Sequence, residues 1–202
     1  MDVKIASVLI GVCLGWFLGQ LTTLTKHYFL RKQKKDAIYT ELSDLSAWLD
    51  RYIKTSEYNI LLTMKGKIAT NLPTKLHAFI INEYFPVICA HLPHGARLGI
   101  TECISQIENL NDISNQIAAL LEKPSEIKNQ ELINRYTSMF SSAFETKWKV
   151  DFLLENKDGD LNKLSGAAKE ISSKLKVSLK EIKKKAGDKS VSDIQFDYYE
   201  KE

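Results

Sequence analysis

The sequence predicts an all-α protein, with one N-terminal transmembrane helix followed by a cytoplasmic antiparallel bundle of about four to five helices. Residues 5–25 carry no charge and are mostly apolar, and about 20 such residues cross a bilayer as a helix. Beyond them, apolar residues recur at spacings of three and four, which is the helical period. The 202 residues include only 9 Gly and 4 Pro, and strand-like alternation is scarce, so helices are favoured throughout.

The chain divides into five expected segments. These are a short extracytoplasmic N-terminus (1–4), the transmembrane helix (5–25), a basic juxtamembrane collar (26–35), the helical bundle (36–187) and a disordered acidic tail (188–202). Bundle helices are expected over 38–64, 73–85, 100–122, 125–155 and 161–182. The first has an apolar stripe beginning at Ile38, can continue from the membrane helix, and ends at Gly66. Pro86, Pro93 and Gly95 leave 86–99 without a predicted structure.

The apolar segment is interpreted as an uncleaved anchor. No small-x-small cleavage site follows Gly19, as a secretory signal would require. Val12 precedes Cys13, where a lipoprotein signal would have a small residue. Lys4 is the only Lys or Arg before the span, whereas the collar after it contains Lys26, Arg31, Lys32, Lys34 and Lys35. Positive residues remain cytoplasmic, so we expect a single-pass protein with its N-terminus outside and its C-terminal domain in the cytoplasm, in a bacterial inner membrane.

Small residues recur every fourth position in the span, at Ser7, Gly11, Gly15 and Gly19. Such a row forms a groove where a second helix backbone can approach closely. Glycine is also common in membrane helices without any partner. The pattern therefore predicts either self-association or pairing with another membrane helix, or it reflects composition alone.

The last predicted helix is rich in lysine. Residues 160–187 hold eight Lys against three acids, and Lys180, Lys183, Lys184 and Lys185 lie beside its apolar stripe. A basic amphipathic helix can bind anionic lipid or an acidic partner. The same pattern describes a bundle helix with an exposed lysine face, which we expect here. Lysine without arginine or interleaved aromatic residues supports only nonspecific phosphate contacts, which argues against a nucleic-acid partner.

Cysteine and histidine come together only at Cys89, His91, His94 and Cys103. Thiolate and imidazole are zinc ligands, but this spacing is not that of a standard zinc site, and buried cysteines with loop histidines explain the same residues. We therefore predict no metal and no cofactor. Phosphate-binding, zinc-protease, nucleophile-elbow and dinucleotide motifs do not occur in the sequence, so nothing favours an enzyme.

These features suggest a membrane-tethered helical interaction or scaffold protein without an evident catalytic site. Its expected partners are the lipid bilayer and another protein, which includes a second copy joined through the transmembrane helix. The alternative is an oligomerising membrane effector or an accessory subunit of a membrane complex. An enzyme with an unrecognised site is the third hypothesis.

Overall fold

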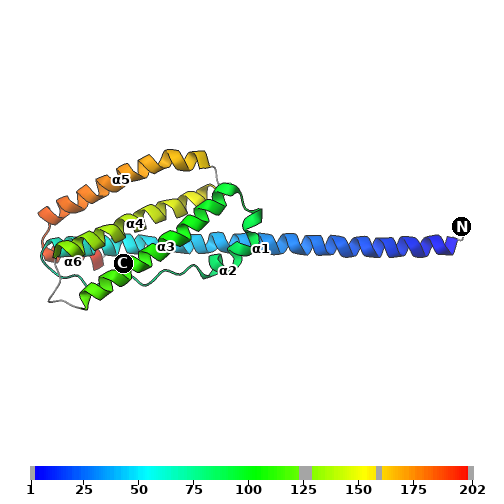
Figure 1. Ribbon diagram of the computed structural model, residues 1–202, viewed down its shortest axis with the longest axis horizontal. Coiled ribbons are helices and arrows are strands. Elements are labelled where there is room, and N and C mark those ends of the chain that lie inside the picture. Colours follow the sequence, from blue (N-terminus) through cyan, green and yellow to red (C-terminus); the bar gives the residue numbers. More distant parts are fainter. Residues whose placement is uncertain (1–2, 123–128, 158–160, 200–202) are drawn as a thin grey trace.

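In the computed structural model, residues 3–122, 129–157 and 161–199 are described, and side chains are described from Leu9 onward except at 161–168, 196 and 199. This part of the chain forms six α-helices and no strand, which confirms the all-α prediction. The helices are α1 (Val3–Met64), α2 (Phe79–Ile88), α3 (His94–Leu121), α4 (Asn129–Glu155), α5 (Leu161–Asp188) and α6 (Val191–Tyr199), with a 3-10 turn, η1 (Cys89–His91), after α2. Figure 1 shows a bundle at one end and the first part of α1 projecting alone from it.

The helix α1 is continuous over 62 residues. Its first part is exposed and its second part is packed in the bundle. Its side chains from 9 to 33, which we call the arm, are all exposed, whereas a buried stripe starts at Ile38. The helix ends as predicted at Gly66, where φ is 76°. The N–H of Lys67 bonds to the carbonyl of Leu62 and that of Gly66 to Thr63, both at 3.0 Å. This is the Schellman arrangement, which needs a left-handed residue and therefore favours glycine.

The core of the bundle lies between α1, α3 and α4. The helix α4 packs against both of the others. Large side chains from all three helices are fully buried there, including Leu42, Leu49, Tyr52, Ile100, Leu110, Ile117, Leu132, Tyr136 and Met139. Burial of each large apolar side chain contributes about 1.5–3 kcal/mol to folding, so this interface is the main source of stability.

Two predicted helix starts are wrong. Residues 67–78 form no helix, and α2 begins at Phe79 rather than Pro73. The segment is instead held against the bundle by side chains: Tyr52 Oη donates to the Thr74 carbonyl at 2.9 Å and Tyr136 Oη to the Ala69 carbonyl at 2.7 Å. The helix α3 begins at His94, six residues before the predicted start, and Pro86 lies inside the last turn of α2. The unassigned stretch 86–99 is therefore mostly helical.

The last two helices attach to the outside of the core. In α5, Ile182 and Ala186 are buried and Leu175 packs against the core, so the helix belongs to the bundle as expected. The tail predicted to be disordered contains α6. It is folded because Ile194 is buried and Tyr198 stacks on Tyr58 of α1, with ring centroids 4.1 Å apart.

No helix in the described part of the chain is long and apolar enough to cross a membrane. The uncharged run with described side chains covers 9–25, or 17 residues, while a span takes about 20. The predicted span begins at Ile5, and the side chains of 5–8 lie outside the described residues.

Candidate functional site

The arm exposes apolar side chains on every side. Its large exposed residues are Leu9, Ile10, Val12, Leu14, Trp16, Phe17, Leu18, Leu21, Leu24, Tyr28, Phe29 and Leu30. Consecutive positions of a helix point about 100° apart, so residues such as Trp16, Phe17 and Leu18 cover different faces. A helix that is apolar all round is a buried or membrane-inserted helix rather than an amphipathic one. Within the described part of the chain, nothing covers the apolar side chains of the arm.

The hydroxyl groups of the arm are satisfied within the helix itself. Thr22, Thr23 and Thr25 donate to the carbonyls of Leu18, Gly19 and Leu21 at 2.7–2.9 Å. This back-bonding removes the need for water at each hydroxyl. Threonine is thus compatible with an apolar surrounding at the end of the uncharged run.

The predicted row of small residues is open. A Cβ atom added at Gly11, Gly15 or Gly19 would meet no atom within 4 Å, and the side chain of Ser7 lies outside the described residues. Nothing in the described chain therefore covers this face, and another helix could approach it.

The basic collar divides into two parts. Lys26, Arg31 and Lys32 are exposed around the helix. Lys34 and Lys35 are partly buried, and their ammonium groups lie 5.4 Å and 5.8 Å from the ring centroids of Tyr84 and Tyr39. Contacts of this kind bind the lysine stems to the bundle. The arm meets the bundle at these two lysines.

The predicted cysteine and histidine cluster does not assemble into a metal site. In the described part of the chain, no group of three or more His, Cys, Asp or Glu side chains is placed to hold a metal ion. Cys103 is fully buried, and burial raises the pKa of its thiol to about 12. Cys89 is partly exposed in η1, while His91 and His94 are exposed. The thiol of Cys103 points into the core, whereas the two histidines remain at the surface.

The lysines of α5 are mostly free at the surface. Lys180, Lys183 and Lys184 are exposed, and Lys185 forms an ion pair with Glu57 of α1 at 2.6 Å. An exposed pair of this kind contributes about 0–1 kcal/mol. These residues thus form the outer face of a bundle helix, with one contact to α1.

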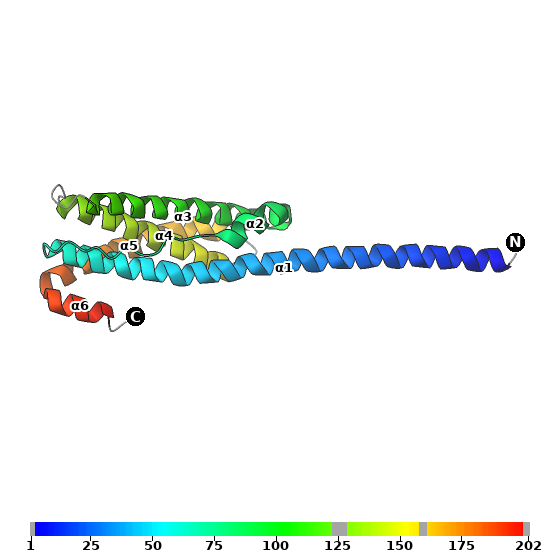
Figure 2. The same ribbon diagram turned by 90° about the horizontal axis from the view of Figure 1, so that it is seen from below.

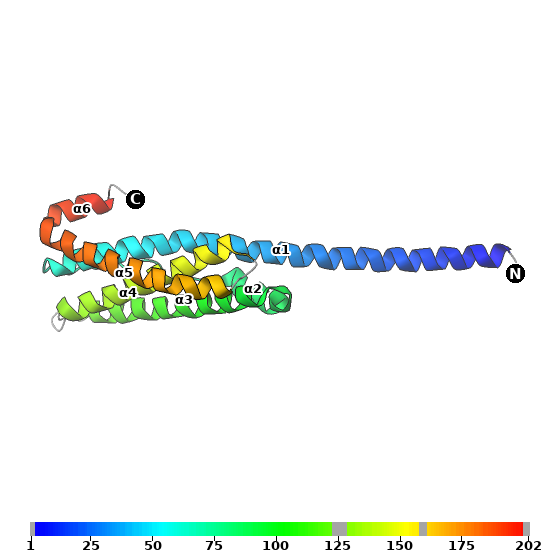
Figure 3. The ribbon, with the colours of Figure 1, turned by 90° about the horizontal axis from the view of Figure 1, so that it is seen from above.

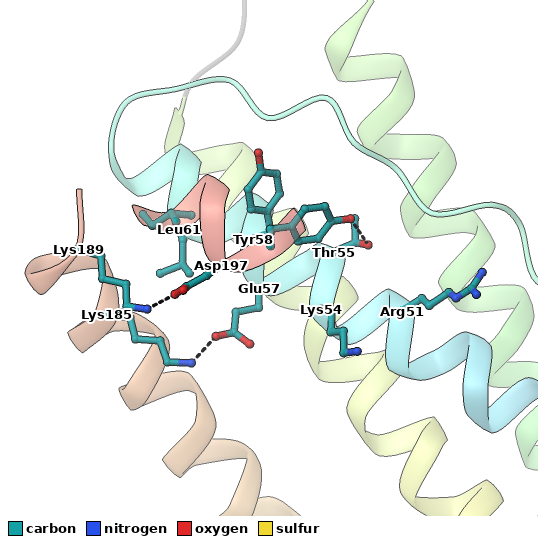
Figure 4. A pocket seen from close by; sticks show the side chains of 11 residues that line it. Arg51, Lys54, Thr55, Glu57, Tyr58, Leu61, Lys185, Lys189 and Asp197 are labelled. Carbon is teal, nitrogen blue, oxygen red and sulfur yellow. Dashed lines mark hydrogen bonds and ion pairs between the residues drawn. The ribbon is translucent and has the colours of Figure 1, made fainter. Parts of the chain in front are cut away.

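A groove of about 530 Å³ lies where α1, α5 and α6 meet, at the end of the bundle opposite the arm. Figure 4 shows Lys185 directed at Glu57 and Lys189 directed at Asp197, while Arg51 and Lys54 lie further along α1. Both carboxylates of the groove are thereby held in ion pairs. The groove keeps a surplus of positive charge. At its wall, Tyr198 of α6 is hydrogen-bonded to Thr55 and stacked on Tyr58 of α1.

Two polar side chains that the sequence analysis did not single out fix the position of α2 and of the segment before it. The carboxylate of Glu41 accepts the N–H groups of Ile80 and Ile81 at 3.0 and 2.5 Å, and it therefore caps the N-terminus of α2. Asn111 of α3 bonds both the N–H and the carbonyl of Leu76. The sequence signal for this cap was Glu41, an acidic residue beside the apolar stripe of α1. Its partner Ile80 is 39 residues away in the chain, so the sequence did not reveal the pairing.

The turn from α2 through η1 into α3, residues 86–98, is termed the elbow. The views of Figures 1, 2 and 3 agree that it lies at the end of the bundle from which the arm projects. Val87 and Leu98 are exposed there. Ile88, Leu92 and Ile100 are buried beneath it, so the elbow is firmly attached. The signal available in the sequence was an acid-free run from 84 to 101.

Comparison with known proteins gives no relative: no protein-family profile, curated protein or solved structure matches the chain.

Proposed function

We propose that this protein is a membrane-tethered helical scaffold, in which the arm inserts into a lipid bilayer and carries the bundle on the cytoplasmic side. One observation carries the proposal: the same uninterrupted helix is uncharged and exposes apolar side chains on all faces from Leu9 to Thr25, and is buried in a protein core from Ile38. Lipid surrounds a helix on every face, whereas a partner helix would cover only one.

The chemistry of the junction supports this arrangement. Tyr28 and Phe29 are exposed and follow the uncharged run, and aromatic rings of this kind favour the headgroup layer. Lys26, Arg31 and Lys32 stand around them. Since Lys4 is the only basic residue on the other side of the run, the positive-inside rule orients the bundle toward the cytoplasm.

The tether is tested on the full chain with Leu14→Asp/Leu18→Asp. Both side chains are exposed, so the bundle should keep its melting temperature, while each charge opposes insertion by about 2.5–3.5 kcal/mol. We expect wild type in the carbonate-resistant membrane fraction and the variant in the soluble fraction. Val177→Asp, an equally exposed site on α5, is the matched control and should behave as wild type. Wild type in the soluble fraction would contradict the proposal.

Orientation has its own test. A fluorescent reporter that folds only in the cytoplasm, fused after Glu202, should be active, and a phosphatase that folds only in the periplasm should not. The reverse result would place the bundle outside.

A second function, an oligomerising membrane effector, is favoured by the open glycine face of the arm. Gly11, Gly15 and Gly19 leave space for a second backbone along a single stripe. In membranes, close helix–helix packing at such stripes is a main source of association. This function shares the tether and differs in requiring a second copy.

A further inference from the structure

We propose that the elbow is a second membrane contact, lying on the headgroup layer with Val87 and Leu98 at the interface and Arg97 against lipid phosphate. The inference rests on the proposed tether and adds to it a docked position of the bundle on the bilayer. Three observations carry it: the height of the elbow along α1, the composition of its surface, and the side chain of Arg97.

The height follows from the contacts between α2 and α1. The N–H of Ile80 bonds to Glu41 at 3.0 Å, while Tyr84 lies over Lys34, with Nζ 5.4 Å from the ring centroid. The helix α2 therefore runs antiparallel to α1, toward the arm. Lys34 is nine residues beyond Thr25, or about 13 Å along a helix. Four further residues of α2 bring the chain at Ile88 about 6 Å closer.

Measured from the Lys34–Tyr84 contact, the elbow thus stands about 7 Å beyond Thr25, where the uncharged run ends. Measured from the Glu41–Ile80 contact, it stands about 12 Å beyond Thr25. A bilayer has a hydrocarbon core of about 30 Å and measures about 40–45 Å with its headgroups, so each headgroup layer is about 5–8 Å deep. The elbow backbone therefore lies at the outer edge of the headgroup layer or just beyond it when the arm is inserted, and its exposed side chains make the contact.

The surface of the elbow suits that layer. Residues 84–101 contain no Asp or Glu, although charged residues form 26% of the chain, and Arg97 is their only formal charge. Its exposed side chains are apolar or imidazole, namely those of Pro86, Val87, Ala90, His91, His94 and Leu98. Membrane-contacting surfaces combine apolar side chains with basic ones and exclude acids, because the headgroups are anionic.

Arg97 supplies the third observation. Its side chain is partly exposed and forms no ion pair with any described residue. Its Nε is buried without a hydrogen-bond partner, so a phosphate would meet the terminal amino groups. A guanidinium group binds phosphate through parallel hydrogen bonds. A phospholipid headgroup is the anion that the geometry brings within reach.

The elbow is also rigid enough to act as a fixed contact. A Cβ atom at Gly99 would stand 2.7 Å from Leu153 Cδ2 of α4, so α3 and α4 are in close contact directly beneath it. Ile88 and Ile100 are buried on the same side. The exposed residues are therefore presented by a packed frame, and contact with lipid would need no refolding.

The test uses the thiol of Cys89, which is on the elbow and partly exposed, while Cys103 is fully buried. The full chain with Cys13→Ser, labelled at Cys89 with the polarity-sensitive dye NBD, is reconstituted into phosphatidylethanolamine–phosphatidylglycerol bilayers. We expect a blue-shifted emission that is quenched by lipids brominated near the headgroup. The control carries the same dye on Lys67→Cys, in a chain with Cys13→Ser/Cys89→Ala. This position follows the far end of α1, so the emission should be that of the dye in water.

Two variants locate the contact. Val87→Asp/Leu98→Asp, at exposed positions, should abolish the lipid quenching at Cys89 and leave the melting temperature unchanged. Arg97→Gln should make the quenching less dependent on phosphatidylglycerol. If the protein resists carbonate extraction but the dye at Cys89 is as accessible to water as the dye at Lys67→Cys, the elbow contact is overturned and the tether stands. Wild-type protein that fails to enter the bilayer would overturn both.

Discussion

The buried carboxylate of Glu41 makes the position of α2 directly testable. It accepts two backbone N–H groups at the start of that helix, and its side chain is itself buried. Glu41→Ala removes both acceptors and leaves two donors without partners. An unsatisfied buried group costs about 1–3 kcal/mol. The Ile80 N–H is only partly buried and costs less than that of Ile81, so we expect the free energy of unfolding to fall by about 2–4 kcal/mol.

The measurement is urea unfolding of the full chain in mild detergent, followed by far-ultraviolet circular dichroism. Glu108→Ala is the control, because Glu108 is exposed on α3 and substitutions at such sites usually change stability by less than about 0.5 kcal/mol. For a chain of this length, the expected loss corresponds to a drop in melting temperature of about 4–16 °C. A loss for Glu41→Ala no larger than the control would show that the carboxylate does not cap α2.

Three further predictions concern two buried tyrosines and the exposed glycines of the arm. Tyr136→Phe leaves the Ala69 carbonyl unpaired and should lower the free energy of unfolding by about 1–2 kcal/mol, whereas Tyr28→Phe, at an exposed site, should not. Burial raises the pKa of Tyr52 and Tyr136 to about 12, so the folded state holds these protons longer than the unfolded state. These tyrosines should therefore leave the free energy of unfolding unchanged below pH 10 and lower it between pH 10 and 12. Urea titrations at several pH values measure this fall, and Tyr136→Phe should make it smaller. Gly11→Ile/Gly15→Ile should reduce self-association in a membrane two-hybrid assay, because the added side chains separate helix backbones; an unchanged signal would mean that the glycines are not an interface.

Local patterns were sufficient where a residue and its structural role are neighbours in the chain. The apolar stripe from Ile38 to Tyr52 predicted the buried face of α1, and these residues are buried. Gly66 ends the helix because the left-handed conformation there is a local requirement. The uncharged run before Lys26 predicted a transmembrane helix; the structure shows an exposed helix there, and its insertion into a bilayer is our proposal.

Only the tertiary structure decided the features that depend on distant contacts. Whether α2 begins at Pro73 or Phe79 depends on Glu41, which caps it from another helix. The segment 191–199 is polar enough to predict disorder, yet Tyr58 of α1 supplies the ring on which Tyr198 stacks. Lys34 and Tyr84 set the height of the elbow. In each case the stabilising partner is tens of residues away or more, so no local pattern could reveal it.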